Sequence, residues 1–359
     1  MNKISDTLRK ILLPLLAFIF MTVSCSDDVY IPRNAVYYFR NPFTLTSQER
    51  DFLVKQEVNS VYLHLFDVNL DSQKQPVTVN EIKFKDRLPE NVEMVPVISF
   101  SSDVITDSLD LDQLSDYVIK NVDRILSENK YEFPREIQID FAWTPENQDA
   151  YFALLRKLSK RVKAKDKKYQ VSVTVRLHQL KANIPPTDYV VLVLFDTDDG
   201  NVPRSTILNY DYIHNRVEGL MTYRKRFTTT LPLYGFDLVY RDSVFQYEAR
   251  GLSLTDTTLY DKVGDNTYMC KQYQHVVLAH DPDNTAARIY PGDVVRHIHP
   301  SSSMLDSVAS LISRVRPDDF GNIVIYQLDD KCIKSYTPEY FRNIFKGGSM
   351  IKDEPLGWD

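Results

Sequence analysis

Glycine is scarce in this chain of 359 residues, and its scarcity argues against several classes of protein. Only 10 glycines are present, and neither the GxGxxG pattern of dinucleotide-binding folds nor the GxxxxGK[ST] phosphate loop occurs. Both motifs need glycine because the backbone must turn tightly and approach a phosphate closely. The sequence therefore gives no support for a nucleotide-binding loop, and we expect the protein to use no cofactor.

Cysteine and basic blocks are lacking as well. The three cysteines, Cys25, Cys270 and Cys332, do not have the close spacing of a metal site, and a disulfide between the last two stays open. The most basic segment, KRVKAKDKK (160–168), reads as the solvated end of a helix, and the formal net charge is −6. Because a nucleic-acid-binding surface needs a basic patch, we expect no nucleic acid partner.

Two short motifs raise the question of a metal ion, and neither is sufficient for one. HIH (297–299) places two imidazoles on one face of an extended segment, but no third ligand is apparent nearby. DTDDGN (196–201) is rich in oxygen ligands but lacks the spacing and the downstream glutamate of an EF-hand. We therefore predict no metal site.

The first 24 residues have the features of a secretory signal. Lys3, Arg9 and Lys10 precede the apolar segment ILLPLLAFIFMTV (11–23). This segment is shorter than the roughly 20 residues that a helix needs to span a bilayer. The pattern therefore predicts a signal peptide. An uncleaved anchor and a plain secreted protein are the alternatives.

The sequence TVSC resembles the lipobox of bacterial lipoproteins, although Thr22 stands where leucine is most common. The resemblance implies that residues 1–24 are removed and that Cys25 becomes the lipid-bearing first residue, which would make the membrane a partner through this lipid. The acidic SDD (26–28) resembles the export signal of surface lipoproteins in some Gram-negative bacteria. We expect residues 25–34 to form a tether and the protein to sit in the bacterial cell envelope, anchored in the outer membrane and exposed at the surface.

Segments with the pattern of strands alternate with segments with the pattern of helices over residues 35–346. Eight strands are predicted, at 35–40, 60–66, 93–100, 136–141, 169–177, 188–196, 231–240 and 322–329. Runs such as VVLVLF are continuously apolar, which is typical of parallel strands that are covered on both faces. Eight such strands with helices between them predict an α/β fold, a single (β/α)8 TIM-like barrel. A doubly wound sheet is the alternative, but it would need fewer strands and usually a glycine-rich first turn.

Two further features complete the predicted organisation. The helix at 145–164 would begin at Pro145, with Thr144 as its N-cap. The segment 241–300, between strands seven and eight, is rich in turns, and we interpret it as an insertion that decorates the barrel. Residues 347–359 would form a C-terminal tail.

Polar side chains recur at the ends of the predicted strands, where a TIM barrel builds its active site. They are Arg40, Asp67, Ser99, Asp140, Arg176, His178, Asp196, Asp237 and Asp329, with Trp143 shortly after Asp140. Any one of them could be an ordinary loop or cap residue, so their recurrence is the stronger signal. Asp140 stands out because the alternation in IQID places it on the same face of a strand as Gln138.

Four stretches resemble glycoside-hydrolase-like TIM barrels. They are IQIDFAWTPENQDAYFALLRKL, VSVTVRLHQL (171–180), LPLYGF (231–236) and NIVIYQLDD (322–330). The resemblance covers residues 35–346 and is closest to an uncharacterised bacterial family of that superfamily. More distantly, the chain resembles the chitinase and endo-N-acetylglucosaminidase family, whose fourth strand ends in an Asp-x-Asp-x-Glu pattern. With Asp140 on the middle aspartate, Ala142 and Thr144 take the last two acidic positions, so the general-acid glutamate is missing and that family's mechanism does not carry over.

A glycosidase needs two carboxyl groups at the scissile bond, roughly 5 Å apart for retention of configuration and about 6.5–9.5 Å apart for inversion. We predict Asp140 as the central carboxylate, either nucleophile or electrostatic stabiliser, with Asp196 or Asp329 as the acid/base. The aromatic residues among the substrate-binding candidates could stack on a sugar ring. The predicted substrate-binding residues are Trp143, Arg176, His178, Tyr223, Tyr234 and Asp237.

The sequence leaves two functions open. In the first, the barrel is a glycoside hydrolase that acts on extracytoplasmic glycan through strand-end carboxylates. In the second, the protein is a non-catalytic glycan-binding or assembly lipoprotein that keeps the barrel but has lost the acid. A second carboxyl within about 10 Å of Asp140 would favour hydrolysis, whereas an Asp140 satisfied by Arg176 would favour binding. The substrate and the oligomeric state also stay open.

Overall fold

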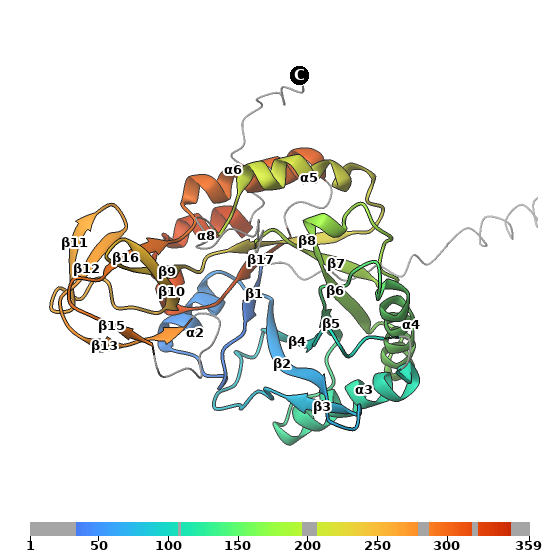
Figure 1. Ribbon diagram of the computed structural model, residues 1–359. Coiled ribbons are helices and arrows are strands. Elements are labelled where there is room, and N and C mark those ends of the chain that lie inside the picture. The colour runs from blue at the N-terminus through green and yellow to red at the C-terminus, as the bar shows by residue number, and fades with distance from the viewer. Residues whose placement is uncertain (1–33, 107–108, 196–206, 279–286, 318–321, 346–359) are drawn as a thin grey trace, which may run out of the picture. The chain divides into compact units, whose positions relative to one another are not determined.

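Eight parallel strands form the centre of the computed structural model, which describes residues 34–106, 109–195, 207–278, 287–317 and 322–345. In chain order they are β1 (Ala35–Tyr38), β2 (Ser60–Leu70), β4 (Glu93–Phe100), β5 (Glu136–Asp140), β6 (Gln170–Arg176), β7 (Tyr189–Val193), β8 (Phe227–Pro232) and β17 (Ile323–Tyr326). Strand β1 pairs in parallel with both β2 and β17, so the sheet closes on itself. Figure 1 shows these strands around a common axis. The predicted (β/α)8 barrel is confirmed.

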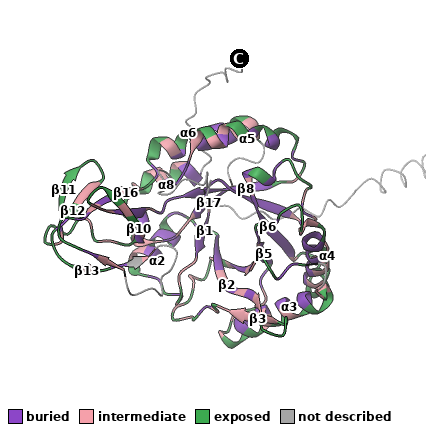
Figure 2. Cartoon of the chain, viewed as in Figure 1, coloured by how far each residue is buried: buried purple, intermediate pink, exposed green. Residues whose placement is uncertain are grey.

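Helices cover the outer face of the barrel, and the main apolar core lies between the two layers. The helices are α2 (Ser47–Lys55), α3 (Leu111–Glu128), α4 (Gln148–Lys165), α5 (Tyr210–Thr222), α6 (Ser302–Val315), α7 (Asp330–Lys334) and α8 (Pro338–Phe345), with the 3-10 turn η1 at Leu177–Gln179. Alternate residues such as Val173 and Val175 of β6 belong to this core, as do Leu154 and Leu158 of α4. In Figure 2 the barrel strands are coloured as buried, whereas the helices carry both buried and exposed stretches.

The helix predicted at 145–164 begins later than its sequence pattern indicated. Helix α4 starts at Gln148, and the prediction of Thr144 as its N-cap is wrong. The side-chain oxygen of Asn147 accepts a hydrogen bond from the Thr144 amide at 2.8 Å, and the Asn147 amide donates to the Thr144 carbonyl at 3.2 Å. These two bonds close a turn that takes the place of the first helical turn.

The prediction of the seventh barrel strand at 231–240 is wrong in its boundaries. Strand β8 ends at Pro232, and residues from Phe236 onward enter a separate sheet. The β8 sequence FTTTLP has a weak apolar signal, but its β-branched threonines favour a strand. The Thr230 hydroxyl donates to the Leu192 carbonyl of β7 at 3.0 Å, which gives this polar side chain a partner inside the barrel wall. As a consequence Asp237 lies in the insertion and not at the end of a barrel strand.

The insertion between β8 and β17 forms a six-stranded antiparallel sheet in the order β11-β12-β16-β9-β10-β14. Its elements are β9 (Phe236–Arg241), β10 (Val244–Arg250), β11 (Tyr260–Gly264), β12 (Thr267–Cys270), β14 (Val277–Leu278) and β16 (Val294–Ile298), with the short pair β13 (Gln274–His275) and β15 (Arg288–Ile289) beside it. This insert has a small core of its own, built around Val239, Tyr260 and Val295. The predicted insertion between strands seven and eight is confirmed (Figure 1). Both Cys270 of the insert and Cys332 of α7 are free and buried.

Polar side chains line the interior of the barrel. Along β5, alternate residues face inward, because Gln138 accepts a hydrogen bond from the Tyr37 hydroxyl at 2.7 Å and Glu136 accepts one from the Ser172 hydroxyl at 2.6 Å. Asp140 follows in the same alternation at the carboxyl end of the strand. The column on β5 therefore leads from the base of the barrel to its mouth.

Candidate functional site

Three polar residues form a row at the carboxyl ends of three neighbouring strands. Asp67 of β2 pairs in register with Ser99 of β4, and Ser99 pairs in register with Asp140 of β5. Residues paired in a sheet point to the same face, so all three side chains point toward the barrel axis with Asp140. Strands lie about 4.8 Å apart, which puts the Cα atoms of Asp67 and Asp140 roughly 10 Å apart. The row places two carboxyl groups at one mouth.

In the described structure, hydrogen bonds hold one carboxylate oxygen of Asp140, and the other oxygen accepts none. Its Oδ1 accepts hydrogen bonds from Thr174 Oγ1 at 2.5 Å and from Arg176 Nη2 at 3.1 Å. Arg176 also donates from Nη1 to Thr174 Oγ1 at 2.9 Å, so the three side chains form a closed triangle. Among the described residues no group donates to Oδ2, and the side chain is 23% exposed. The carboxylate is thus fixed in place with one oxygen available to a ligand.

A β-bulge in β2 brings one further side chain, that of His64, to the face of Asp67. Strand β2 pairs His64 with Val97 and Phe66 with Ile98, so Leu65 is an extra residue in the ladder. The extra residue shifts the alternation, and His64 and Asp67 come to lie on the same face although they are three positions apart. His64 Nε2 lies 2.6 Å from Asp67 Oδ1. The bulge therefore builds a His–Asp pair at the mouth, two strands away from Asp140.

Asp67 is the anchor of this pair. The Asn80 amide donates to Asp67 Oδ2 at 2.6 Å, from the residue that follows β3 (Pro76–Val79), an antiparallel strand paired with β2. Burial acts to raise the pKa of Asp67, but the hydrogen bond and charge of His64 and the hydrogen bond from Asn80 outweigh it and lower the pKa. Asp67 is consequently an ionised acceptor with a partner on each oxygen.

Aromatic rings form a wall on the β1, β17 and β7 side of the mouth. The Tyr326 ring centroid lies 4.6 Å from that of Phe195 and 5.4 Å from that of Tyr234. Phe39 and Tyr37 each lie 5.6 Å from Tyr326. The wall is continuous with the His–Asp pair because Phe39 also stacks on the His64 ring. Tyr37, Phe195 and Tyr234 are buried, whereas Phe39 and Tyr326 are half-buried and are the wall rings on which a sugar ring could pack.

The predicted acid/base residues do not join Asp140 in the described part of the mouth. Asp329 is the N-cap of α7, where it accepts from the amides of Lys331 and Cys332, and it lies 3.7 Å from the Arg40 guanidinium. Asp196 lies outside the described residues. Of the three predicted catalytic carboxylates, Asp140 alone has a described position facing the barrel axis.

Trp143 lies behind the mouth, whereas His178 lies on the turn that directly follows Arg176 at the end of β6. The Trp143 ring is buried against Phe152, at a centroid distance of 5.4 Å, and its carbonyl accepts a hydrogen bond from Gln179. His178 is exposed on the η1 turn. The Trp143 ring therefore has no open face for the predicted stacking, whereas Tyr234, another predicted substrate-binding residue, packs in the buried part of the aromatic wall.

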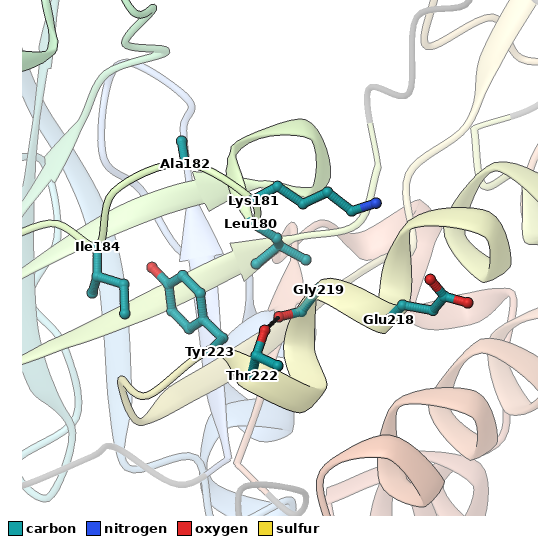
Figure 3. Close-up of a pocket in the computed structure, with 8 residues that line it drawn as sticks. All are labelled: Leu180, Lys181, Ala182, Ile184, Glu218, Gly219, Thr222 and Tyr223. Atoms are coloured by element: carbon teal, nitrogen blue, oxygen red, sulfur yellow. Dashed lines mark hydrogen bonds between the residues drawn. The ribbon is translucent and has the colours of Figure 1, made fainter.

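Tyr223 lines a side pocket between η1 and α5, as Figure 3 shows. The pocket has a volume of about 430 Å³, and its rim carries Lys181 and Glu218. Leu180 packs so closely on Gly219 of α5 that an added methyl group would lie 2.9 Å from the Leu180 Cβ. The position of Tyr223, like that of Trp143, is set by the packing of η1 on the helix layer.

Asp237 forms a second His–Asp pair in the insert. Its Oδ1 lies 2.7 Å from His297 Nδ1, and the Leu252 amide donates to Oδ2 at 3.3 Å. The carboxylate is almost fully buried, and the His297 ring stacks on His299 at 5.1 Å. His297 of the HIH motif thus gives the buried Asp237 carboxylate a hydrogen-bond partner. Within the described residues no group of three or more His, Cys, Asp or Glu side chains is placed to hold a metal ion.

Sequence reasoning missed several residues of the mouth, among them Phe39, His64 and Tyr326. A signal was available for two of these, because alternation puts Phe39 on the face of Tyr37 and His64 on the face of Tyr62. Neither residue is an acid, and the prediction considered acids at strand ends. The bulge that brings His64 to Asp67 has no mark in the sequence.

Comparison with known proteins gives matches among solved structures only. No family model matches the chain, and no curated protein matches it. The spore cortex-lytic enzyme SleL of Bacillus cereus is similar with a TM-score of 0.52 at 14% identity, over 88% of this chain and 75% of that one. A chitinase from Chromobacterium violaceum gives 0.51 at 12% identity, over 89% and 100%. A family GH18 chitinase from Cycas revoluta gives 0.51 at 10% identity, over 87% and 99%.

The chain has the fold of the chitinase-like TIM barrels. Identities this low show the fold alone, so the function has to be argued from the mouth itself. No helix in the described part of the chain is long and apolar enough to cross a membrane.

Proposed function

We propose that this chain is a lipid-anchored protein of the bacterial cell envelope that binds glycan at the carboxyl-end mouth of its barrel. The observation that carries the proposal is Asp140, whose Oδ2 is free of hydrogen bonds from the described residues, in a mouth that also holds an arginine and an aromatic wall. In TIM barrels this end of the strands is where ligands bind.

The chemistry of the mouth fits a sugar. Sugar hydroxyls donate to carboxylates and accept from guanidinium groups, and Asp140 and Arg176 offer both kinds of partner at one place. Within the described residues, two of the five Arg176 side-chain N–H groups are used, on Asp140 and Thr174, and the others are donors that a ligand could use. The apolar faces of a pyranose ring pack on aromatic rings such as Tyr326. Little side-chain entropy would be lost when a ligand binds, because the hydrogen bonds among Asp140, Thr174 and Arg176 already fix these side chains.

The similar solved structures support glycan as the ligand class. They include chitinases and a spore cortex-lytic enzyme, and one chitinase of Cycas revoluta was solved with (GlcNAc)3. The lipid anchor rests on the amino-terminal sequence, in which the basic and apolar segments lead to Cys25. Chito-oligosaccharides and other envelope or host glycans are therefore the first ligands to test.

Hydrolysis is the second candidate function, and one specific observation favours it. The His64–Asp67 pair and Asp140 lie at the same mouth, with roughly 10 Å between the Cα atoms of Asp67 and Asp140, and inward-pointing side chains in a barrel converge. A spacing of this kind leaves room for a water between two catalytic groups, as in inverting glycosidases.

The test is a panel of chito-oligosaccharides, peptidoglycan fragments and complex N-glycans, offered to the purified mature chain (residues 25–359). Binding is measured by calorimetry and cleavage by mass spectrometry. Asp140→Asn should lower the affinity for the bound glycan by roughly tenfold or more, because a hydrogen bond to a charged group is lost. Asp242→Asn, in an exposed turn of the insert, is the matched control. Equal affinity of Asp140→Asn and the parent would remove Asp140 from the site, and a panel without any bound glycan would overturn the proposed function.

A further inference from the structure

We infer that His64, held by Asp67, is the general acid of a glycoside hydrolysis in which Asp140 activates the attacking water. The inference rests on the proposed glycan site and adds to it the catalytic group that the sequence did not reveal. The two catalytic groups would then be the His64 imidazole, held by Asp67, and the Asp140 carboxylate, in place of the two carboxyl groups usual in glycosidases.

The orientation of His64 follows from its contacts. Asp67 is ionised and can only accept, so Nε2 of His64 carries the proton of the 2.6 Å hydrogen bond. The ring is fixed from a second side by Phe39, at a centroid distance of 5.1 Å and an interplanar angle of 29°. Nδ1 has no hydrogen-bond partner within the described residues, and the side chain is 13% exposed. Two constraints thus hold the imidazole and leave one nitrogen for a ligand.

Two other acids among the described residues of the barrel interior, Asp67 and Glu136, are not placed to supply the proton. Asp67 is ionised and has a hydrogen-bond partner on each oxygen. Glu136 holds its proton more readily, but it is 2% exposed at the opposite end of β5. The imidazole of His64, held at Nε2 by Asp67, presents Nδ1 as the proton donor at the mouth. His64 lies on β2, which is separated from Asp140 on β5 by the single strand β4.

The reaction balances without any further reagent. Imidazolium His64 gives its Nδ1 proton to the glycosidic oxygen while the bond from that oxygen to the anomeric carbon breaks. A water attacks the anomeric carbon from the opposite face, and its proton passes to Asp140 Oδ2. Each product carries a new hydroxyl, the anomeric configuration is inverted, and both side chains recover their starting protonation from solvent.

The leaving group provides the decisive test, because a good leaving group needs no acid. Each sugar that the mature chain binds in the panel is prepared as its natural oligosaccharide and as its 2,4-dinitrophenyl glycoside. His64→Gln keeps a donor for Asp67 and should slow cleavage of the oligosaccharide about 100-fold or more. Cleavage of the dinitrophenyl glycoside should change less than about threefold, and calorimetric affinity should be retained. His275→Gln, on an exposed residue of the insert, should match the parent on both substrates.

Three results would count against the inference, and they differ from failure of the glycan site. A glycan that is bound but never cleaved by the parent chain overturns it and leaves the binding function standing. Equal slowing of both substrates by His64→Gln, or no slowing of either, also overturns it. If no panel member is bound, the proposed function itself falls. Circular dichroism melting of the variant checks that the loss is not one of folding.

Discussion

The carboxyl group of Glu136 lies at the base of the barrel interior and accepts hydrogen bonds from Ser172 and Tyr189, each at 2.6 Å. Burial raises its pKa from the ordinary 4.5 to about 7, and the hydrogen bonds, which favour the charged form, only partly offset this. The neighbouring phenols of Tyr62 and Tyr189 stay neutral because burial raises their pKa values as well. The only group in this cluster that changes charge near neutral pH is therefore Glu136.

This cluster predicts that the folded protein loses stability as pH rises. Below pH 4.5 Glu136 is protonated in both states, and between about pH 4.5 and 7 the unfolded chain loses the proton while the folded chain keeps it. The contribution of Glu136 should thus fall through this window, by on the order of 3 kcal/mol, and stay low above it. Glu136→Gln should remove the difference. Urea unfolding at pH 5 and pH 8 measures the effect.

Glu90→Gln, an exposed substitution with the same change of charge, is the control and should keep the parent's pH dependence. If the free energy of unfolding changes equally between pH 5 and pH 8 in the parent and in Glu136→Gln, then Glu136 does not titrate in this range. The interpretation of the barrel base as a proton-holding cluster would then be wrong.

Two elements meet at Gly235, where the chain leaves barrel strand β8 and enters insert strand β9. A Cβ at this position would lie 2.8 Å from the Ile298 carbonyl oxygen and 2.9 Å from the His297 ring. The first contact is to backbone of β16, which cannot move without disturbing its pairing with β9. Glycine is needed here for close approach and not for its backbone angles.

We predict that Gly235→Ala destabilises the protein by roughly 1–3 kcal/mol, because the added methyl must displace backbone. Gly264→Ala, in β11, is the matched control: its Cβ would lie 3.5 Å from the nearest atom, an ordinary contact. Thermal unfolding compares the two variants. Equal melting temperatures would mean that the backbone at Gly235 and Ile298 can move apart without loss of stability. The His297–Asp237 pair would then not depend on this close contact.

Element boundaries were predicted well where apolar runs are long and poorly where other forces decide. Strands β6 and β7 lie close to their predicted ranges, because a strand that is buried along its whole length has a clear apolar pattern in the sequence. The range predicted for strand β8 was wrong because its three buried threonines give no apolar signal in the sequence. Helix α4 was predicted to begin too early because a turn closed by the Asn147 side chain takes the place of its first helical turn. The bulge at Leu65 was invisible, since its cause is pairing with another strand.

At the scale of the whole molecule, the proposed anchor predicts how the protein partitions. Metabolic labelling with radioactive palmitate should mark the parent chain, and the label should follow the outer-membrane fraction. Cys25→Ser should abolish the label and release the chain from the membrane, because the thiol is the only proposed attachment point. Cys270→Ser keeps Cys25 and should keep the label. Unlabelled parent chain, or label that survives Cys25→Ser, would contradict the lipobox interpretation.

The sequence by itself determined the barrel, the position of the insertion, and the placement of Asp140 at the end of an inward-facing column, because period and burial are local properties of a strand. Only the tertiary structure decided which partners Asp140 has. The Arg176 and Thr174 contacts follow from strand neighbours, the pairing of His64 with Asp67 from a bulge, and the removal of Asp237 to the insert from where β8 ends. A site of this kind is assembled from register between strands far apart in the chain, and register depends on long-range pairing that no short stretch encodes.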